Sequence, residues 1–218
     1  MIVAVDGPGG SGKSTVSRRL AARLGWLHLD TGAFYRAATL AVLRAGADLS
    51  ADSVLGAVAD RTFRQEDGRM YLDGEDVSAD IRSPEVTATV SAVSSFAGVR
   101  RVMVRHQREW VARHQRDVVV EGRDIGTVVF PEADLKIWLS ASAEERARRR
   151  ALQTGEAHDD VLKELSRRDR ADSERKVSPL TPAPDAVYLD STGMTVGEVL
   201  ERILALIEAG KQGSPNHP

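Results

Sequence analysis

The sequence predicts an α/β fold built on a parallel sheet, with a small antiparallel insertion. An apolar run at residues 2–6 leads through a glycine-rich turn into an amphipathic helix and then into a second short strand, which together form a βαβ unit. Two more buried-strand runs come later, at 118–120 and 135–139. Residues 62–77 contain two Asp-Gly pairs typical of hairpin turns, so this part predicts antiparallel strands.

The composition is that of a globular protein and excludes several classes. The chain has 218 residues, 42% of them hydrophobic, which is enough for one domain with an insertion. It has no cysteine, so neither a disulfide framework nor a thiolate metal site is possible. A net charge of −2 provides no general attraction to nucleic acid, and no apolar run approaches the roughly 18 residues of a membrane span. We therefore expect a cytoplasmic protein without a nucleic-acid or membrane partner. A monomer is also expected, although the sequence does not give the oligomeric state.

The first elements follow from apolar spacing and from turn residues. Val16, Leu20 and Leu24 recur every four residues after the glycine-rich turn, which predicts a helix capped by Ser14 or Thr15 and ended by Gly25. Residues 26–30 then predict a strand, and residues 33–45 predict a helix of small and apolar side chains.

The middle of the chain predicts the insertion and two helices. The strands are expected at 62–65, 69–72 and 75–77, separated by Asp67-Gly68 and Asp73-Gly74. Pro84 is expected to begin a helix that runs to about residue 96, and a second helix is expected over 99–116, with apolar residues on one face and arginines on the other.

After the strand at 135–139, residues 143–153 and 159 to about 174 predict two charged helices joined by a polar loop at 154–158. Three prolines within 178–184 exclude helix and central strand there, because proline removes a donor and restricts the residue before it. A last strand is expected at 186–190 and a last helix at 195–209. Residues 210–218 are expected to form a disordered tail.

The most specific motif is Gly-Pro-Gly-Gly-Ser-Gly-Lys-Ser at residues 7–14, which matches G-x-x-x-x-G-K-S between a predicted strand and a predicted helix. Its glycines let backbone N–H groups turn toward an anion at the positive end of the helix. Lys13 would reach the β- and γ-phosphates of a nucleotide, and the Ser14 hydroxyl would bind Mg²⁺. The motif predicts a phosphate-binding loop (P-loop) for a nucleoside triphosphate such as ATP, made by Gly7, Pro8, Gly9, Gly10, Ser11, Gly12, Lys13, Ser14 and Thr15.

The arginines indicate a second anionic ligand. Of the 30 basic residues 25 are arginine, whose planar fork binds phosphate through two hydrogen bonds, although a G+C-rich genome would give the same bias. Arg36, Arg123, Arg168 and Arg175 come from four separate regions, as a clamp around two phosphates would require. Each of them, taken alone, also fits a surface or salt-bridge residue.

Four segments together resemble the bacterial cytidylate kinase family. They are Asp6-Gly7-Pro8, residues 30–36 (Asp-Thr-Gly-Ala-Phe-Tyr-Arg), residues 121–131 (beginning Glu-Gly-Arg-Asp-Ile-Gly-Thr) and residues 168–180. The resemblance runs from residue 1 to about 209. It implies a nucleoside monophosphate (NMP) kinase with a P-loop NTPase-type core and a five-stranded parallel sheet flanked by helices. The core would comprise 1–30 and 85–209, with a short lid at about 153–162. Residues 31–84 would form the NMP-binding arm, with its β insertion at about 60–80.

The resemblance also implies roles for particular residues. Lys13, Arg123 and Arg168 would be catalytic, and Arg36, Arg123 and Arg168 would hold the acceptor phosphate. Ser91, Arg100 and Asp124 would bind the cytosine edge, in which a donating amino group suits a carboxylate. Asp172 with Arg168 would hold the ribose, Thr31 would line the acceptor site, and Arg175 would lie toward the phosphates or the base. An ordinary structural role stays open for Ser91 and Asp124, and Arg101 is an alternative to Arg100.

The implied activity is ATP-dependent phosphorylation of CMP, and of dCMP, in pyrimidine nucleotide metabolism. Mg²⁺ would accompany ATP, held by the Ser14 hydroxyl and by Glu121 through a water molecule; relatives often have Asp at position 121. Arg148 and Arg150, beside the polar loop, would contact ATP as the lid closes. Two alternatives stay open: a P-loop kinase for another small molecule such as shikimate, and a nucleotide-dependent switch. No Asn-Lys-x-Asp segment, the guanine-reading motif of signalling GTPases, is present.

Overall fold

The computed structural model describes residues 1–175 and 177–213, without the side chains of 211–213. The chain forms two compact units. Unit 1 contains residues 1–28, 117–170 and 180–213, and unit 2 contains residues 29–116, 171–175 and 177–179. Residues 85–116, expected in the core, group here with the predicted arm, because their helices pack on the helices and strands that precede them.

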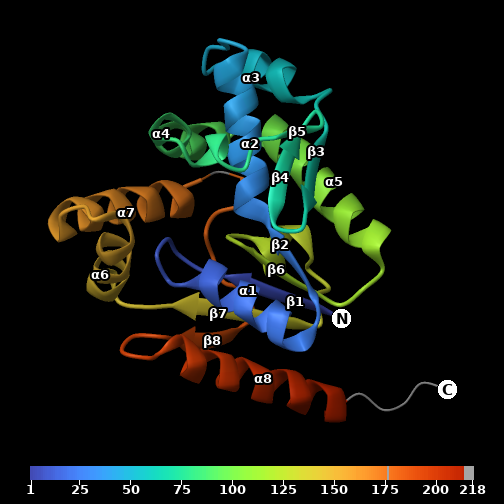
Figure 1. Ribbon diagram of the computed structural model, residues 1–218, viewed down its shortest axis with the longest axis vertical. Coiled ribbons are helices and arrows are strands. Elements are labelled where there is room, and N and C mark those ends of the chain that lie inside the picture. Colours follow the sequence, from blue (N-terminus) through green and yellow to red (C-terminus); the bar gives the residue numbers. More distant parts are fainter. Residues whose placement is uncertain (176, 214–218) are drawn as a thin grey trace. The chain divides into compact units, whose positions relative to one another are not determined.

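The five-stranded sheet has the spatial order β2-β6-β1-β7-β8 (Figure 1). Its strands are β1 (Ile2–Asp6), β2 (Leu27–Asp30), β6 (Val118–Gly122), β7 (Leu135–Ser140) and β8 (Val187–Asp190). β1 pairs in parallel with β6 and with β7, and β7 pairs in parallel with β8. The predicted parallel sheet is confirmed.

Helices α1 (Lys13–Leu24) and α8 (Val196–Gly213) contact each other on one face of this sheet. Their side chains share a core with the central strands; Leu20, Ile203 and Leu139 are fully buried within it. The apolar spacing that predicted α1 is therefore the spacing that packs it on the sheet.

Two sequence-based boundaries of unit 1 differ from the structure, and one agrees with it. The residue that precedes α1 is Gly12 in the left-handed region, with no side-chain cap, so the caps expected at Ser14 or Thr15 were wrong. Gly25 ends α1 in the left-handed region, as predicted. α8 continues to Gly213, so residues 210–213 are helical rather than a tail, and the expectation for 214–218 falls outside the described residues.

The remaining elements of unit 1 follow β6 and β7, the strands on either side of β1. A π-helix, η2 (Ile125–Val129), follows β6 and was not predicted. Helix α6 (Ala143–Thr154) follows β7, and α7 (His158–Ser173) comes after a loop of three residues and extends into the residues of unit 2. The lid expected at about 153–162 covers the end of α6, this loop and the start of α7.

Unit 2 begins with α2 (Thr31–Arg44), which packs against strand β4 and helix α4. The antiparallel sheet has the order β3-β4-β5, made by β3 (Phe63–Glu66), β4 (Arg69–Leu72) and β5 (Glu75–Asp76). Asp67 and Asp73 have φ values of 48° and 50°, each followed by glycine with positive φ, as the predicted hairpin turns require. Figure 1 shows these strands beside α2.

The other helices of unit 2 are α3 (Ala51–Val58), the 3₁₀-helix η1 (Asp80–Arg82), α4 (Pro84–Val93) and α5 (Ala97–His114). α3 was missed because its eight residues include glycine, serine and aspartate, although Ser50 caps it through the Ser53 N–H. α4 ends three residues earlier than expected, and Ser94 and Ser95 there bond back to carbonyls of the last turn.

Candidate active site

The P-loop joins β1 to α1 through Gly7–Gly12, and its geometry requires glycine. A Cβ on Gly7 would lie 2.1 Å from the Leu139 carbonyl oxygen, and the φ of Gly7 is 152°. Gly12, with φ 93°, turns the chain into the first turn of α1, where the backbone N–H groups point outward from the helix. The loop therefore offers backbone donors at the positive end of a helix, which is an anion-binding arrangement.

Lys13, at the start of α1, folds back over this loop. Its Nζ donates to the Pro8 carbonyl oxygen at 2.7 Å and to Ser11 Oγ at 3.4 Å. Burial and, to a lesser degree, the nearby Arg123 guanidinium lower the pKa of Lys13 to about 7. An anion bound to the loop would favour the charged ammonium and raise that pKa.

Ser14 and Glu121 bring two oxygen groups together beside Lys13. The Ser14 hydroxyl donates to Glu121 Oε2 at 2.7 Å; Ser14 is exposed, whereas Glu121 is 3% exposed. Hydroxyl and carboxylate oxygens are the ligands that Mg²⁺ prefers, so the two predicted metal-site residues fit this ion. The contact also places the acidic end of β6 next to the P-loop.

Asp6, the last residue of β1, holds the turn that carries Arg123 and Asp124. Its two carboxylate oxygens accept from the N–H groups of Ile125 at 2.8 Å and Gly126 at 2.7 Å. Burial, opposed by these two hydrogen bonds, raises the pKa of Asp6 to about 6. No role was predicted for Asp6 from the sequence, although its place directly before Gly7 was a usable signal.

Arginines surround the P-loop in unit 1. Arg123 Nη1 donates to the Gly7 carbonyl oxygen at 3.2 Å, and Arg146 Nη1 donates to the Gly9 carbonyl oxygen at 2.9 Å. Asp169 on α7 forms an ion pair with Arg146 and accepts from the Gly9 N–H at 3.1 Å. Arg123 is 3.7 Å from the same carboxylate. No role was predicted from the sequence for Asp169 or Arg146. Asp169 lies between two arginines in the sequence, a pattern that is typical of a surface salt bridge.

Arg168, one residue earlier on α7, adds to this positive charge. Its Nε is buried and has no hydrogen-bond partner in the part of the chain that the structure describes. Burial lowers the pKa of Arg168, and burial together with Arg168 lowers the pKa of Arg123 to about 10. The positively charged guanidinium groups of Arg123 and Arg168 repel each other beside a loop that offers N–H donors. A bound anion would offset this repulsion.

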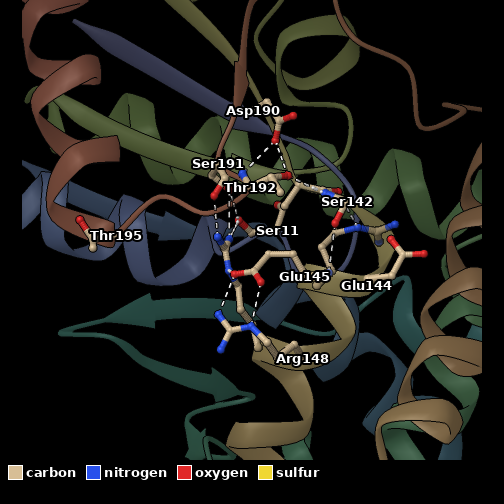
Figure 2. Close-up of polar contacts among 12 residues, drawn as sticks. Ser11, Ser142, Glu144, Glu145, Arg148, Asp190, Ser191, Thr192 and Thr195 are labelled. Atoms are coloured by element: carbon tan, nitrogen blue, oxygen red, sulfur yellow. Dashed lines mark hydrogen bonds and ion pairs between the residues drawn. The ribbon is translucent and has the colours of Figure 1, made fainter.

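The arginines of α6 divide between the P-loop and the surface. Arg148, which is exposed, donates two hydrogen bonds to Glu145, each 2.8 Å long. Figure 2 shows this pair. Arg149, which was not predicted, donates to the Ser11 carbonyl at 3.4 Å and to Ser191 Oγ at 3.0 Å. Arg150 is exposed and lies close enough to Arg168 to lower its pKa. The predicted ATP contacts of Arg148 and Arg150 stay predictions.

Unit 2 carries Thr31 and Arg36 on α2. Asp30 caps this helix by accepting from the Ala33 N–H at 3.1 Å, and Thr31 is the first helical residue and is buried. Arg36 Nη1 donates to the Ile81 carbonyl oxygen at 3.1 Å and to Thr87 Oγ1 at 3.0 Å. The chain after the β insertion and helix α4 thus fix the direction of Arg36.

Arg100 on α5 is almost fully buried, at 3% exposed. Its Nη1 donates to the Ser94 carbonyl at 3.2 Å, and its guanidinium lies 5.1 Å from the centre of the Tyr35 ring, a cation–π distance. Ser91 is half-buried on α4 and its carbonyl accepts from Ser94 Oγ. The alternative Arg101 is exposed on α5, which favours Arg100 as the ordered member of the pair.

The last predicted residues are also buried. Asp172 and Arg175 in unit 2 form an ion pair with 4% and 8% of their side chains exposed. Asp124 in unit 1 is 4% exposed. The predicted set is thus divided: unit 1 contains Lys13, Glu121, Arg123, Asp124 and Arg168, whereas unit 2 contains Thr31, Arg36, Ser91, Arg100, Asp172 and Arg175.

Comparison with known proteins gives matches along almost the whole chain. A family model described as cytidylate kinase matches residues 3–209. Cytidylate kinases of Desulforamulus reducens and Nocardia farcinica are 49% and 50% identical, over 96% and 95% of this chain and 97% and 93% of theirs. A solved structure of an uncharacterized protein from Eubacterium ventriosum has the same fold, with a TM-score of 0.55 at 12% identity, over 96% of this chain and 98% of that one.

Proposed function

Because this chain belongs to the cytidylate kinase family, we propose that it transfers the γ-phosphoryl group of ATP to a phosphate oxygen of CMP, giving ADP and CDP. The supporting observation is the positive charge at the P-loop. Arg123, Arg146 and Arg168 gather there around a loop of backbone donors, and the pKa values of Arg123 and Arg168 are lowered. Two phosphate groups side by side are the ligand that this charge suits.

The donor nucleotide is assigned to the P-loop. Residues 7–15 would bind the triphosphate of ATP through backbone N–H groups, and Lys13 would turn from the Pro8 carbonyl to the β- and γ-phosphates. Arg148 and Arg150 would contact ATP as the segment at about 153–162 closes and excludes water.

Mg²⁺ would be held by the Ser14 hydroxyl and, through a water molecule, by Glu121. The Ser14 hydroxyl and the Glu121 carboxylate are already hydrogen-bonded to each other. When bound, the ion would offset the negative charge of the phosphate oxygens during transfer.

The acceptor nucleotide is assigned to a second set of residues. Arg36, Arg123 and Arg168 would hold the phosphate of CMP, and Thr31 would line its site. Ser91, Arg100 and Asp124 would read the cytosine; a carboxylate accepts from the amino group of cytosine and would repel the oxygen at the same position of uracil. Asp172 with Arg168 would hold the ribose, and Arg175, already paired with Asp172, would lie toward the phosphates or the base.

The reaction requires no general base in this proposal. The second pKa of a phosphate monoester is about 6, so near pH 7 the CMP phosphate is mostly a dianion and already a nucleophile. Catalysis would then depend on alignment and on charge, supplied by Lys13, Arg123 and Arg168.

An ADP-release assay with CMP, dCMP, UMP, AMP and shikimate tests the proposal. The expected result is turnover with CMP and dCMP that exceeds turnover with UMP, AMP and shikimate. Shikimate-stimulated turnover would support the alternative kinase, and ATP hydrolysis indifferent to every acceptor would support a nucleotide-dependent switch.

The expected monomer and the cytoplasmic location are also proposals. None of the helices in the described part of the chain is both long and apolar enough to span a membrane. Light scattering coupled to size-exclusion chromatography would test the monomer, with a mass near 23.6 kDa expected.

A further inference from the structure

We propose that His28 is a positioning residue for the magnesium site: it holds the Glu121 carboxylate in the orientation that accepts the Ser14 hydroxyl, and thereby strengthens binding of the metal–nucleotide complex. This inference rests on the proposed function, because it concerns the metal that accompanies ATP. Neither the sequence motifs nor the roles assigned above include His28.

Hydrogen bonds connect the side chains of Ser14, Glu121 and His28, with Glu121 in the middle. Glu121 Oε2 accepts from the Ser14 hydroxyl at 2.7 Å, and Glu121 Oε1 lies 2.9 Å from His28 Nε2. The side chains of His28 and Glu121 are 15% and 4% exposed, whereas Ser14 is exposed. β2 and β6, which carry His28 and Glu121, are neighbours in the sheet, so the pair lies on a rigid support.

The direction of each hydrogen bond follows from the groups themselves. An ionised carboxylate only accepts, so Ser14 must donate its single hydroxyl proton and His28 Nε2 must carry a proton. With that proton committed to Glu121, the lone pairs of the Ser14 oxygen face away from the carboxylate, where they can bind a cation. The orientation of Glu121 thus decides which way Ser14 presents its oxygen.

Glu121 needs a second donor to keep that orientation. A glutamate has three rotatable side-chain bonds, so a hydrogen bond at one carboxylate oxygen restrains its orientation less than hydrogen bonds at both oxygens. His28 binds this second oxygen from the next strand and restricts the rotation. A buried carboxylate that loses a donor also loses stabilisation of its charge.

Two substitutions separate this role from simple packing. His28→Leu retains bulk and removes the donor, whereas His28→Gln places an amide nitrogen at nearly the same reach as Nε2. Mn²⁺ serves as the probe, because its binding to the enzyme–ATP complex can be followed by electron paramagnetic resonance without CMP or turnover.

We expect His28→Leu to weaken Mn²⁺ binding to the enzyme–ATP complex about tenfold, the usual loss on removing an outer partner of a metal ligand. ATP affinity measured in EDTA should stay within twofold of the parent protein, and His28→Gln should restore Mn²⁺ binding to within about threefold. Equal Mn²⁺ affinity in the parent and in His28→Leu would overturn the proposal. So would a loss of ATP affinity that is the same with and without metal, since that is the result of a structural defect.

A double-mutant cycle with Ser14→Ala tests the route of the effect. In the Ser14→Ala background, His28→Leu should change Mn²⁺ affinity by less than twofold, because the hydroxyl through which it acts is gone. A full tenfold effect in that background would show that His28 acts elsewhere. If His28→Leu does not fold, as judged by its thermal unfolding, His28→Asn replaces it, because its shorter amide does not reach Glu121. Since no acceptor is present, failure of the CMP assignment leaves these results unaffected.

Discussion

In unit 1, three cationic side chains contact the backbone of one short loop, the P-loop, whereas in unit 2 Arg36 contacts atoms contributed by separate helices. Lys13, Arg123 and Arg146 donate to the Pro8, Gly7 and Gly9 carbonyls respectively. Arg36 instead donates to Ile81, in η1, and to Thr87, in α4. The unit 1 side chains thus share one loop as their support, whereas Arg36 is held by the packing of separate helices. Changes of unit 2 contacts should therefore alter acceptor binding and leave ATP binding intact.

The largest effect is expected for Lys13→Met. Removal of the ammonium takes away a charge that is proposed to contact the transferring phosphoryl group, so kcat/KM should fall by about 10²–10³-fold. Steady-state kinetics with ATP and CMP measure it. A loss smaller than tenfold would contradict a catalytic role for Lys13. It would also remove the expected difference between this variant and variants of unit 2.

Arg123→Ala is expected to lower kcat/KM by about 10²-fold, because Arg123 is proposed to contact the phosphate that accepts the transfer. Arg113→Ala is the matched control: this arginine is 67% exposed on α5, with a 3.5 Å contact to Glu109, and its loss should change kcat/KM less than twofold. Similar losses in the two variants would mean that general charge, rather than position, decides the rate.

Nucleotide affinity should depend on pH through Lys13. The pKa of Lys13 is about 7 in the ligand-free protein, and bound phosphates favour the charged form, so above pH 7 binding must take up a proton. ATP affinity should then decrease from pH 7 to 9 by up to about tenfold per pH unit, and this dependence should be absent in Lys13→Met. Calorimetric titration at several pH values measures it; an identical slope in the variant would assign the proton to another group.

The smallest effect is expected for Thr87→Val, which removes the hydroxyl that accepts from Arg36 and keeps the shape of the side chain. Because the Arg36 guanidinium loses one hydrogen bond, we expect the KM for CMP to rise about threefold to tenfold. The KM for ATP should stay unchanged. Thr87→Ser, which retains the hydroxyl, is the control and should resemble the parent. An equal rise in both KM values would contradict the expectation that a change in unit 2 leaves ATP binding intact.

The sequence predicted the parts of the fold that local rules determine. The turns at Gly68 and Gly74 and the end of α1 at Gly25 follow from glycine's access to positive φ, and the P-loop follows from its motif. α3 was missed because its composition is poor for a helix and its packing on α2 and α5 is a tertiary effect. The π-helix was missed because the carboxylate that anchors its first N–H groups, Asp6, is 119 residues away.

The candidate site divides in the same way. Residues 7–14 could be read from their spacing, whereas Thr31, Ser91 and Asp172 were named only through the family resemblance. His28 and Asp169 had no signal of their own, since each acquires its partners from strands or loops distant in the sequence. Hydrogen bonds between distant side chains depend on the folded packing, and no spacing rule encodes them.

The most direct test of the central claim, that two nucleotides bind side by side for transfer, is a crystal structure with CMP and a non-hydrolysable ATP analogue. The account predicts the analogue's phosphates on the P-loop, the CMP phosphate on Arg36, Arg123 and Arg168, and the cytosine amino group on Asp124. CMP bound in the P-loop itself, or three guanidinium groups directed into solvent away from both nucleotides, would contradict it.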